Sequence, residues 1–489
     1  MKGSLYTPGA LSVGIDPHLF VIFGGTGDLA RGKLLPALYQ LLQRRDFADP
    51  VQVLAVATRE IDDDAYRAMA VESLAAAGHD GADDWASSAL HYQSLKFGWE
   101  ALATRIAGIE RAAGLPGNRA FYLAVPPSVL ADTIESLGKV GIIGSGGWSR
   151  VVVEKPFGTD RRTSAELNNL LHAWFGEEQI YRIDHYLAKE TVQNLMALRF
   201  ANPLFESSWT RDRIDSVQIT VAEDIGIGSR AGYYDKAGAI RDIIQNHALQ
   251  IFTLVAMEPP VKATADHIRD EKVKVLQATR SLSRDSLVRG QYTGGTVDGT
   301  EVVSYHQEPG VDPSSTTETF AAMRLSVDNW RWHDVPFYIR AGKRLASRVT
   351  QVSVVFREPP VALFSVENEC EMHPNVFDIR LQPSEGFALS FEMKLPGEGY
   401  RLQTQRLRFA YDEAFGELPD AYATLIADVM SGDQTLFVRA DEVDEAWRIV
   451  QPVLDLADMP EPYPAGSWGP VGADRLLGDE GRHWLLPSF

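Results

Sequence analysis

The stretch HLFVIFGGTGDLA, residues 18–30, decides the fold of this chain. The apolar run from His18 to Phe23 predicts a buried strand, and the amphipathic stretch Lys33–Arg44 predicts a helix. Between them, residues 25–30 fit the pattern G-x-G-x-x-G/A. In this context glycines let the backbone approach a pyrophosphate, and the helix N-terminus offers N–H groups and a positive dipole end. The residues predicted to bind a dinucleotide are Gly24, Gly25, Thr26, Gly27, Asp28 and Leu29.

Further apolar runs alternate with helical stretches over the first 180 residues or so. The predicted strands are Val51–Ala57, Ala120–Ala124 and Arg150–Val153. Alternation of strand and helix is typical of a doubly wound parallel sheet, so an α/β Rossmann domain is expected here.

The second half of the chain has a different pattern. Strand-like segments rich in β-branched residues follow one another across turns such as Pro383–Gly386, which favours a large, mainly antiparallel sheet in an α+β domain. The expected strands are Ile214–Val221, Val349–Phe356, Val376–Gln382 and Phe387–Lys394, and the expected helices are Ala239–Met257, Ala421–Met430 and Ala440–Ala457. We expect two domains, residues 1–184 and 185–489, with the boundary near Asp184.

Composition excludes several classes of protein. The chain has 489 residues and a formal net charge of −19, which argues against broad nucleic-acid binding. Its one cysteine, Cys370, allows no intramolecular disulfide and is interpreted as a small, partly buried side chain. Neither a signal peptide nor an apolar run long enough to span a membrane is visible, so a cytoplasmic location is expected. No metal site is expected.

The end of the second strand should contact the ribose of the dinucleotide. An acidic residue there is typical of NAD sites, and an arginine of NADP sites. The sequence reads Ala57-Thr58-Arg59-Glu60, so Arg59 favours NADP, whereas Glu60 and residues 62–64 either begin a solvated helix or favour NAD.

The segment Glu154-Lys155-Pro156-Phe157-Gly158 follows a predicted strand of the first sheet. Ligands meet the carboxyl ends of such strands, so Lys155 can reach both cofactor and substrate, and Pro156 can shape the nicotinamide pocket. An ordinary exit from a surface strand explains the segment equally well.

The segment Arg182–Glu190 places several polar residues together. If a helix begins here, His185 and Lys189 share one face, and with the Tyr186 hydroxyl they can hold a phosphate dianion. The alternative is a solvated helix start capped by Asp184.

The segment Gly238–Gln250 places Arg, Asp, Gln, Asn and His in a helix that is otherwise apolar. Buried polar groups need partners or a function, so this helix is expected to line a cavity. His247 suits the general base of an alcohol oxidation, with a carboxylate that orients it. Because Asp242 and His247 are five apart, they do not lie strictly on one face of an α-helix, but both can line one pocket if the helix runs along it. Asp184 and Asp242 both remain candidate partners of His247.

Several motifs in order resemble the glucose-6-phosphate dehydrogenase family, from Phe20 to about Leu456. They are GGTGDLARGK (24–33), EKPFG (154–158), RIDHYLAKE (182–190), RDIIQNHALQ (241–250), VPFYIRAGK (335–343) and FVRADEVDEAW (437–447). The resemblance implies a Rossmann domain followed by a β+α domain, and dimers or tetramers formed through the large sheet. It implies oxidation of glucose 6-phosphate at C1 to 6-phosphogluconolactone, the first oxidative step of the pentose phosphate pathway, with NADP as the expected cofactor.

The resemblance also implies roles for individual residues. His247 is similar to the general base, and Asp184 to its carboxylate partner. The remaining implied substrate residues are His185, Tyr186 and Lys189 for the phosphate, Glu223 and Asp242 for the sugar hydroxyls, Lys343 and Arg348 at the edge of the pocket, and Lys155. Implied cofactor contacts beyond the glycine loop and Arg59 are Lys155, Pro156 and Tyr122.

The chain departs from the family pattern at two places. Ala188 stands where the family has Gly, which is tolerated if the backbone there is helical. Thr58 stands where the family has Arg, with Arg59 one position later, so NAD use stays an alternative to NADP.

Two rival functions are weaker. Oxidoreductases of the glucose–fructose oxidoreductase type also join a Rossmann domain to a sheet domain, but they lack RIDHYLxKE. An inactive paralogue with a regulatory role should have lost the base, a phosphate ligand or the glycine loop, and all three are present.

Overall fold

The computed structural model describes residues 15–43, 50–144, 146–361, 363–364, 373–397, 400–416, 420–456, 458–478 and 481–487. Cys370 lies outside the described residues. The chain forms two compact units: unit 1 comprises residues 1–188, 262–269 and 419–443, and unit 2 comprises residues 189–261, 270–418 and 444–489. Unit 1 therefore includes two segments from later in the chain, residues 262–269 and 419–443. A single boundary near Asp184 does not describe this arrangement.

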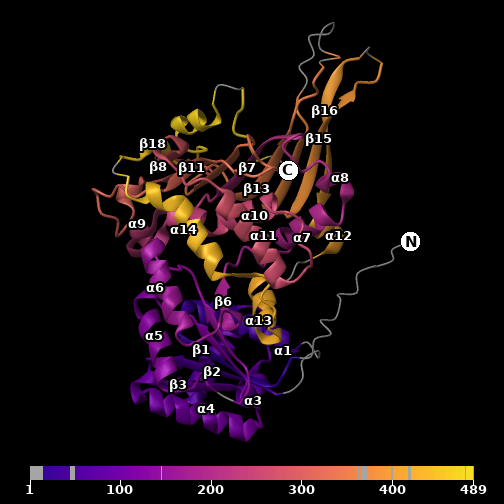
Figure 1. The fold of residues 1–489 in the computed structure, drawn as a ribbon. Helices are drawn as coiled ribbons and strands as arrows, with labels where there is room; N and C mark the ends of the chain where they lie inside the picture. Colours follow the sequence, from indigo (N-terminus) through magenta and orange to yellow (C-terminus); the bar gives the residue numbers. More distant parts are fainter. Residues whose placement is uncertain are drawn as a thin grey trace. The chain divides into compact units, whose positions relative to one another are not determined.

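Unit 1 contains a seven-stranded sheet with the order β17-β6-β5-β4-β1-β2-β3 (Figure 1). Its strands are β1 (His18–Phe23), β2 (Val51–Ala57), β3 (Leu90–Ser94), β4 (Arg119–Leu123), β5 (Ser149–Val153), β6 (Ile180–Ile183) and β17 (Phe437–Val438). All neighbours pair in parallel except β17, which runs antiparallel to β6. The order 3-2-1-4-5-6 is that of dinucleotide-binding sheets, and the strand order reverses between β1 and β4. The predicted Rossmann domain is confirmed.

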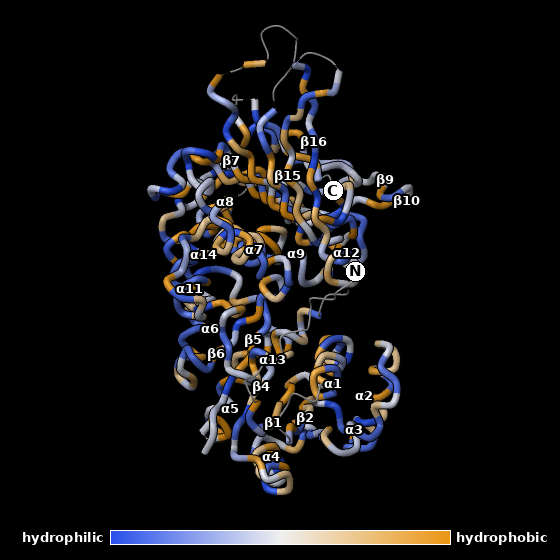
Figure 2. Tube along the Cα trace, turned by 90° about the vertical axis from the view of Figure 1, so that its right-hand side faces the viewer, coloured by the Kyte–Doolittle hydropathy of each residue, from blue (hydrophilic) through white to orange (hydrophobic). Residues whose placement is uncertain are grey.

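Helices connect these strands. They are α1 (Leu35–Gln43), α2 (Asp63–Ala76), α3 (Asp83–Ala89), α4 (Trp99–Ala113), α5 (Pro127–Lys139), α6 (Arg161–His172) and α13 (Ala421–Ser431), with a π-helical stretch, Ala30–Leu34, before α1. Every residue of β1 is buried, and the strands β1, β2 and β4 consist mostly of hydrophobic residues (Figure 2). A parallel sheet needs such continuous apolar strands because helices cover both of its faces.

The segment with α13 and β17 comes from late in the chain and still belongs to unit 1. Helix α13 packs against α1, and β17 extends the sheet at β6. The Arg150 guanidinium donates hydrogen bonds to the carbonyls of Val429 and Met430, at 2.7 and 2.6 Å, at the end of α13. Cations favour a helix C-terminus because the last carbonyls lack partners within the helix.

Unit 2 contains a nine-stranded sheet with the order β16-β15-β14-β13-β7-β12-β11-β8-β18. The strands are β7 (Ile214–Ala222), β8 (Leu287–Thr293), β11 (Phe320–Leu325), β12 (Phe337–Gly342), β13 (Val349–Phe356), β14 (Val376–Gln382), β15 (Gly386–Lys394), β16 (Leu402–Ala410) and β18 (Glu461–Pro464), with a separate hairpin of β9 (Gly295–Val297) and β10 (Thr300–Val302). Among the described strands of this second sheet, only the pairs β7–β12 and β8–β18 are parallel. The predicted mainly antiparallel sheet is confirmed.

The expected helix Ala239–Met257 begins at the last residue of a separate helix and then divides into two segments. The separate helix is α9 (Ala231–Ala239), and the two segments are a π-helix (Ile240–Ala248) and α10 (Leu249–Ala256). Other helices are α7 (Glu190–Phe200), α8 (Pro203–Glu206), α11 (Ala265–Ala278), α12 (Tyr411–Phe415) and α14 (Ala440–Leu454). Among the described residues, no helix is long and apolar enough to cross a membrane.

Asp428 on α13 gives unit 1 a pH dependence. Burial, with the like charge of Asp433, raises the pKa of Asp428 from 3.8 to about 8. A raised folded-state pKa means that the folded protein holds this proton more tightly than the unfolded chain does. Ionisation of Asp428 therefore removes stability as the pH rises from about 4 to about 8.

We expect Asp428→Asn to be more stable than the parent at pH 8 and equally stable at pH 4, because the amide never ionises. Thermal unfolding across this pH range measures the difference. Replacement of the exposed Asp132 on α5 by Asn removes the same charge and serves as the control. Parallel pH profiles of the parent and Asp428→Asn would contradict the assignment.

Candidate active site

The glycine loop joins β1 to the helical segment that begins at Asp28. The amides of Gly24 and Gly25 both donate to the Val56 carbonyl, at 2.8 and 3.1 Å. Gly24 has a φ of +80°, and a Cβ there would lie 2.1 Å from the Ala124 carbonyl oxygen. A Cβ on Gly25 would lie 2.6 Å from the Ala55 Cβ. The loop therefore tolerates only glycine at these positions, because it lies against Ala55 of β2 and against Ala124, the residue after β4.

Thr26 and Gly27 lie at the tip of this loop, and Asp28 and Leu29 begin the helix. Gly27 and Asp28 are exposed, and the Gly27 amide donates to the Gly24 carbonyl at 2.9 Å. The first amides of a helix lack intrahelical acceptors and favour an anion. The backbone amides at the start of this helix therefore suit a pyrophosphate.

Thr58, Arg59 and Glu60 follow β2 and are exposed. The Glu60 carboxylate lies 3.4 Å from the Lys96 Nζ. Within the described part of the chain, the Arg59 guanidinium has no ion-pair partner. The exposed Arg59 side chain is next in sequence to Glu60, whose carboxylate is already paired with Lys96.

Residues 62–64 begin α2. Asp62 caps the helix by accepting the Ala65 amide at 2.9 Å, and Asp63 accepts the Tyr92 amide at 2.9 Å. Asp64 pairs with Arg67. Of the two predicted alternatives for these acids, the structure shows the helix start.

Glu154 follows β5 and accepts a hydrogen bond from the Tyr122 hydroxyl at 2.6 Å. Tyr422 of α13 interacts with the same carboxylate. Burial raises the pKa of Glu154 above its usual value, although Tyr122 and Lys155 oppose the shift. Tyr122 is fully buried, so the structure places it beneath the turn that presents the partly exposed Lys155 and Pro156.

The predicted helix at Arg182–Glu190 is wrong. Strand β6 ends at Ile183, residues 185–188 form turns, and α7 begins only at Glu190, with Lys189 in an extended conformation. The Asp184 carboxylate accepts the Tyr186 amide at 3.0 Å, and its carbonyl accepts the Leu187 amide at 3.0 Å. The turn that these bonds close is not continued as a helix, because Lys189 is extended, so His185 and Lys189 do not share a helical face.

Asp184 and Tyr186 are buried, whereas His185 is half-buried. Ala188 lies in the same turn and, among the described residues, is not one with a positive φ. Alanine is therefore accommodated where the family has glycine, although the turn is not helical. The Lys189 Nζ donates to Gln382, which in turn donates to the Thr350 hydroxyl at 3.0 Å.

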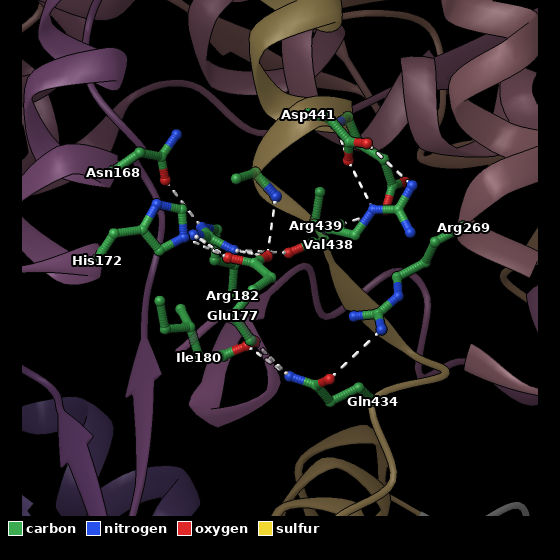
Figure 3. A network of polar contacts seen from close by, with 12 residues as sticks. Asn168, His172, Glu177, Ile180, Arg182, Arg269, Gln434, Val438, Arg439 and Asp441 are labelled. Atoms are coloured by element: carbon green, nitrogen blue, oxygen red, sulfur yellow. Dashed lines mark hydrogen bonds and ion pairs between the residues drawn. The ribbon is translucent and has the colours of Figure 1, made fainter. Parts of the chain in front are cut away.

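Arg182, one residue before the end of β6, is buried and heavily bonded (Figure 3). Its guanidinium contacts both carboxylate oxygens of Glu177, at 2.6 and 3.1 Å, and donates to Asn168 at 3.1 Å and to the Val438 carbonyl at 3.4 Å. Glu177 also accepts the Ala440 amide at 3.0 Å. A bidentate pair of this kind fixes both position and orientation.

Gln434 adds a second connection to β6 (Figure 3). Its side-chain amide donates to the carbonyls of Ile180 and Glu177, at 2.9 and 3.0 Å, and its oxygen accepts from Arg269 at 3.4 Å. Residues 434–440 therefore hold β6, the strand that ends just before Asp184.

In unit 2, Asp242 and His247 lie on the π-helix Ile240–Ala248, and both are buried. A π-helix bonds residue i to residue i+5, so residues five apart lie about one turn apart. This spacing is compatible with the expectation that both can line one pocket, which stays a prediction. The Tyr233 hydroxyl lies 3.5 Å from the Asp242 carboxylate.

The start of this π-helix is fixed by Glu318. Its carboxylate accepts the Ile240 amide at 3.2 Å, and its carbonyl accepts the Ala239 amide at 3.0 Å. Gly238, with a φ of 65°, leaves room for the carboxylate, because a Cβ there would lie 2.3 Å from it. Burial raises the pKa of Glu318.

The predicted substrate residues Glu223 and Lys343 lie side by side. Strands β7 and β12 are parallel and end at the paired residues Ala222 and Gly342. The next residues form an ion pair between the Lys343 Nζ and the Glu223 carboxylate, and the Lys343 Nζ lies 5.1 Å from the centre of the Tyr234 ring. Arg348 is exposed just before β13.

Sequence reasoning missed Tyr422, Gln434, Gln382 and Glu318. The first two belong to a segment more than 200 residues after β6, and only the FVRADEVDEAW motif marks that region. A buried acid in a polar loop, such as Glu318, carries no local signal.

The glycine loop gives a direct test. We expect Gly24→Ala to lose dinucleotide binding and several degrees of thermal stability, because a non-glycine residue at this φ costs about 1–2 kcal/mol even without the contact with Ala124. Fluorescence titration with a reduced nicotinamide dinucleotide and thermal unfolding measure both effects. Gly32→Ala is the control, since a Cβ there meets nothing within 4 Å. Normal binding by Gly24→Ala would contradict this account.

Family models match both parts of the chain. The model described as "Glucose-6-phosphate dehydrogenase, NAD binding domain" matches residues 21–194, and the model of the C-terminal domain matches residues 196–485.

Full-length relatives agree with the family models. The glucose-6-phosphate 1-dehydrogenase of Aggregatibacter actinomycetemcomitans is 44% identical over 485 residues, covering 96% of this chain and 97% of the relative. That of Rhizobium meliloti is 42% identical over 491 residues, covering 96% and 98%.

Solved structures are similar over the same length. A glucose-6-phosphate dehydrogenase in complex with glucose 6-phosphate superposes with a TM-score of 0.88 at 34% identity, covering 97% of this chain and 99% of that one. The enzyme from Mycobacterium avium gives a TM-score of 0.84 at 38% identity, with the same coverage. This chain therefore belongs to the glucose-6-phosphate dehydrogenase family.

Proposed function

We propose that this chain oxidises glucose 6-phosphate at C1 with NADP as hydride acceptor and His247 as general base. Membership of the family carries the reaction itself, and the cofactor is a nicotinamide dinucleotide. The exposed Arg59, beside a Glu60 whose charge Lys96 matches, is the observation that favours NADP over NAD.

The proposed chemistry is removal of a proton and a hydride from C1 and its hydroxyl. His247 takes the hydroxyl proton, and the Asp184 carboxylate stabilises the resulting imidazolium. A nicotinamide dinucleotide bound to this chain would supply the hydride acceptor. The glycine loop would hold the pyrophosphate of NADP and Arg59 its 2′-phosphate, with Lys155 and Pro156 beside the nicotinamide and Tyr122 as a further cofactor contact.

We assign the other predicted residues to the sugar phosphate. His185, Tyr186 and Lys189 bind the dianion, and Glu223 and Asp242 accept hydrogen bonds from the sugar hydroxyls. Lys343, Arg348 and Lys155 add positive charge. The pair between Glu223 and Lys343 orients both side chains before substrate binds.

We further propose a homodimer or homotetramer formed through the nine-stranded sheet, and a cytoplasmic location, which suits a chain with one cysteine. The division near Asp184 is proposed as the covalent junction between cofactor-binding and substrate-binding parts.

His247→Asn tests the base. We expect kcat to fall by about 10²- to 10⁴-fold, the usual contribution of a positioned base, with binding of glucose 6-phosphate retained. Initial rates at saturating substrate and an equilibrium binding assay separate the two effects. Replacement of the exposed His333 by Asn is the control. Near-normal turnover of the His247 variant would sink the assignment.

Arg59→Ala tests the cofactor. We expect kcat/KM for NADP to fall by about 10- to 100-fold, the size of one charge-assisted hydrogen bond, and the value for NAD to stay within about twofold. Arg162→Ala removes an exposed arginine of the same unit and should leave both values unchanged. Equal losses with the two dinucleotides would show that Arg59 does not read the 2′-phosphate.

A further inference from the structure

Two buried tyrosines contact the backbone of the two turns to which the dinucleotide is assigned. Tyr66 of α2 is fully buried, and its hydroxyl donates to the Gly25 carbonyl at 2.9 Å. Tyr92 of β3 is buried, and its hydroxyl donates to the Arg59 carbonyl. Each hydroxyl therefore fixes one peptide in a turn at the carboxyl end of a strand, where ligands bind in such sheets.

The two rings also contact each other. They stack with a centroid distance of 5.1 Å and an interplanar angle of 23°. The Tyr92 amide donates to Asp63 at 2.9 Å, and Asp63 pairs with Arg105, so the backbone beneath the second ring is held as well. The stack is a rigid connection between the peptide at Gly25 and the peptide at Arg59.

Packing alone does not explain both hydroxyls. A phenylalanine pair would keep the stack and would bury no hydroxyl groups. In this chain each hydroxyl instead donates a hydrogen bond to a backbone carbonyl of a turn assigned to the cofactor. Each of these carbonyls lies in a turn, where no strand ladder continues to hold it.

We propose that Tyr66 and Tyr92 are positioning residues that set the spacing between the glycine loop and Arg59, and that Tyr92 thereby determines selectivity for a 2′-phosphorylated dinucleotide. The inference rests on the proposed use of NADP. Tyr92 places the Arg59 backbone, and the guanidinium can then meet the phosphate without a cost in ordering. Tyr66 acts on the pyrophosphate loop, which NAD and NADP share.

The two tyrosines therefore have different signatures. We expect Tyr92→Phe to raise the KM for NADP by about three- to tenfold, the range for loss of one hydrogen bond, and to change that for NAD by less than about twofold. We expect Tyr66→Phe to raise the KM for both dinucleotides by a similar factor. In both variants kcat and the KM for glucose 6-phosphate should stay unchanged, because the hydride-transfer residues are not touched.

The decisive experiment is a double-mutant cycle of Tyr92→Phe and Arg59→Ala. In each variant, the measured quantity is the ratio of kcat/KM for NADP to kcat/KM for NAD. If Tyr92 acts through Arg59, the double variant should match Arg59→Ala alone. Tyr39→Phe is the control: its ring lies on His79 and Trp85, in the same unit, and no hydrogen bond of its hydroxyl to either turn is present among the described residues.

Additive losses in the cycle, or an unchanged ratio in Tyr92→Phe while Arg59→Ala loses selectivity, would overturn the inference and leave NADP use intact. An Arg59→Ala variant as selective as the parent would overturn both proposals. A lowered unfolding temperature with unchanged KM values would show that the tyrosines serve stability alone.

Discussion

The carboxyl ends of parallel strands all meet at one edge of a sheet, and unit 1 depends on this constraint. The turns after β1, β2, β5 and β6 carry the glycine loop, Arg59, Lys155 and Asp184. Segments separated by more than a hundred residues reach one edge because each strand runs in the same direction. The parallel pair β7–β12 in unit 2 obeys the same rule, which is why Glu223 and Lys343 form an ion pair.

Much of this could be predicted from the sequence. The strands His18–Phe23, Val51–Ala57, Val349–Phe356 and Val376–Gln382 have the predicted bounds, because apolar β-branched runs ended by glycine or polar residues have few alternatives. The predicted helix at Arg182–Glu190 is wrong because Arg182 and Ile183 pair with β5 and β17 in the sheet and Lys189 is extended, and the spacing of polar residues registers neither.

Features that depend on contacts between residues far apart in the chain could not be predicted from the sequence. The π-helix Ile240–Ala248 follows from a kink at Gly238 and from the Glu318 carboxylate, 78 residues away from Ile240. The two-residue strand β17 is too short to carry a pattern. It is held beside β6 because Arg182 of β6 donates to the Val438 carbonyl and Gln434, just before β17, donates to the Ile180 carbonyl. Such elements are set by tertiary contacts between buried polar groups, which must find partners wherever the chain supplies them.

Selectivity between two dinucleotides is usually assigned to the side chain at the end of β2. In this chain that side chain is one residue from an acid, so its identity alone is an incomplete explanation. A phosphate contact needs the guanidinium in place before the ligand arrives, and the position of a guanidinium is first a question of where its backbone lies. The Tyr92 hydroxyl acts on the backbone, and the charge of Lys96 acts on the neighbouring acid. Under the proposed use of NADP, these two contacts make the arginine available without contacting the cofactor themselves, and they account for a phosphate site in a chain that has Thr58 at the family's arginine position.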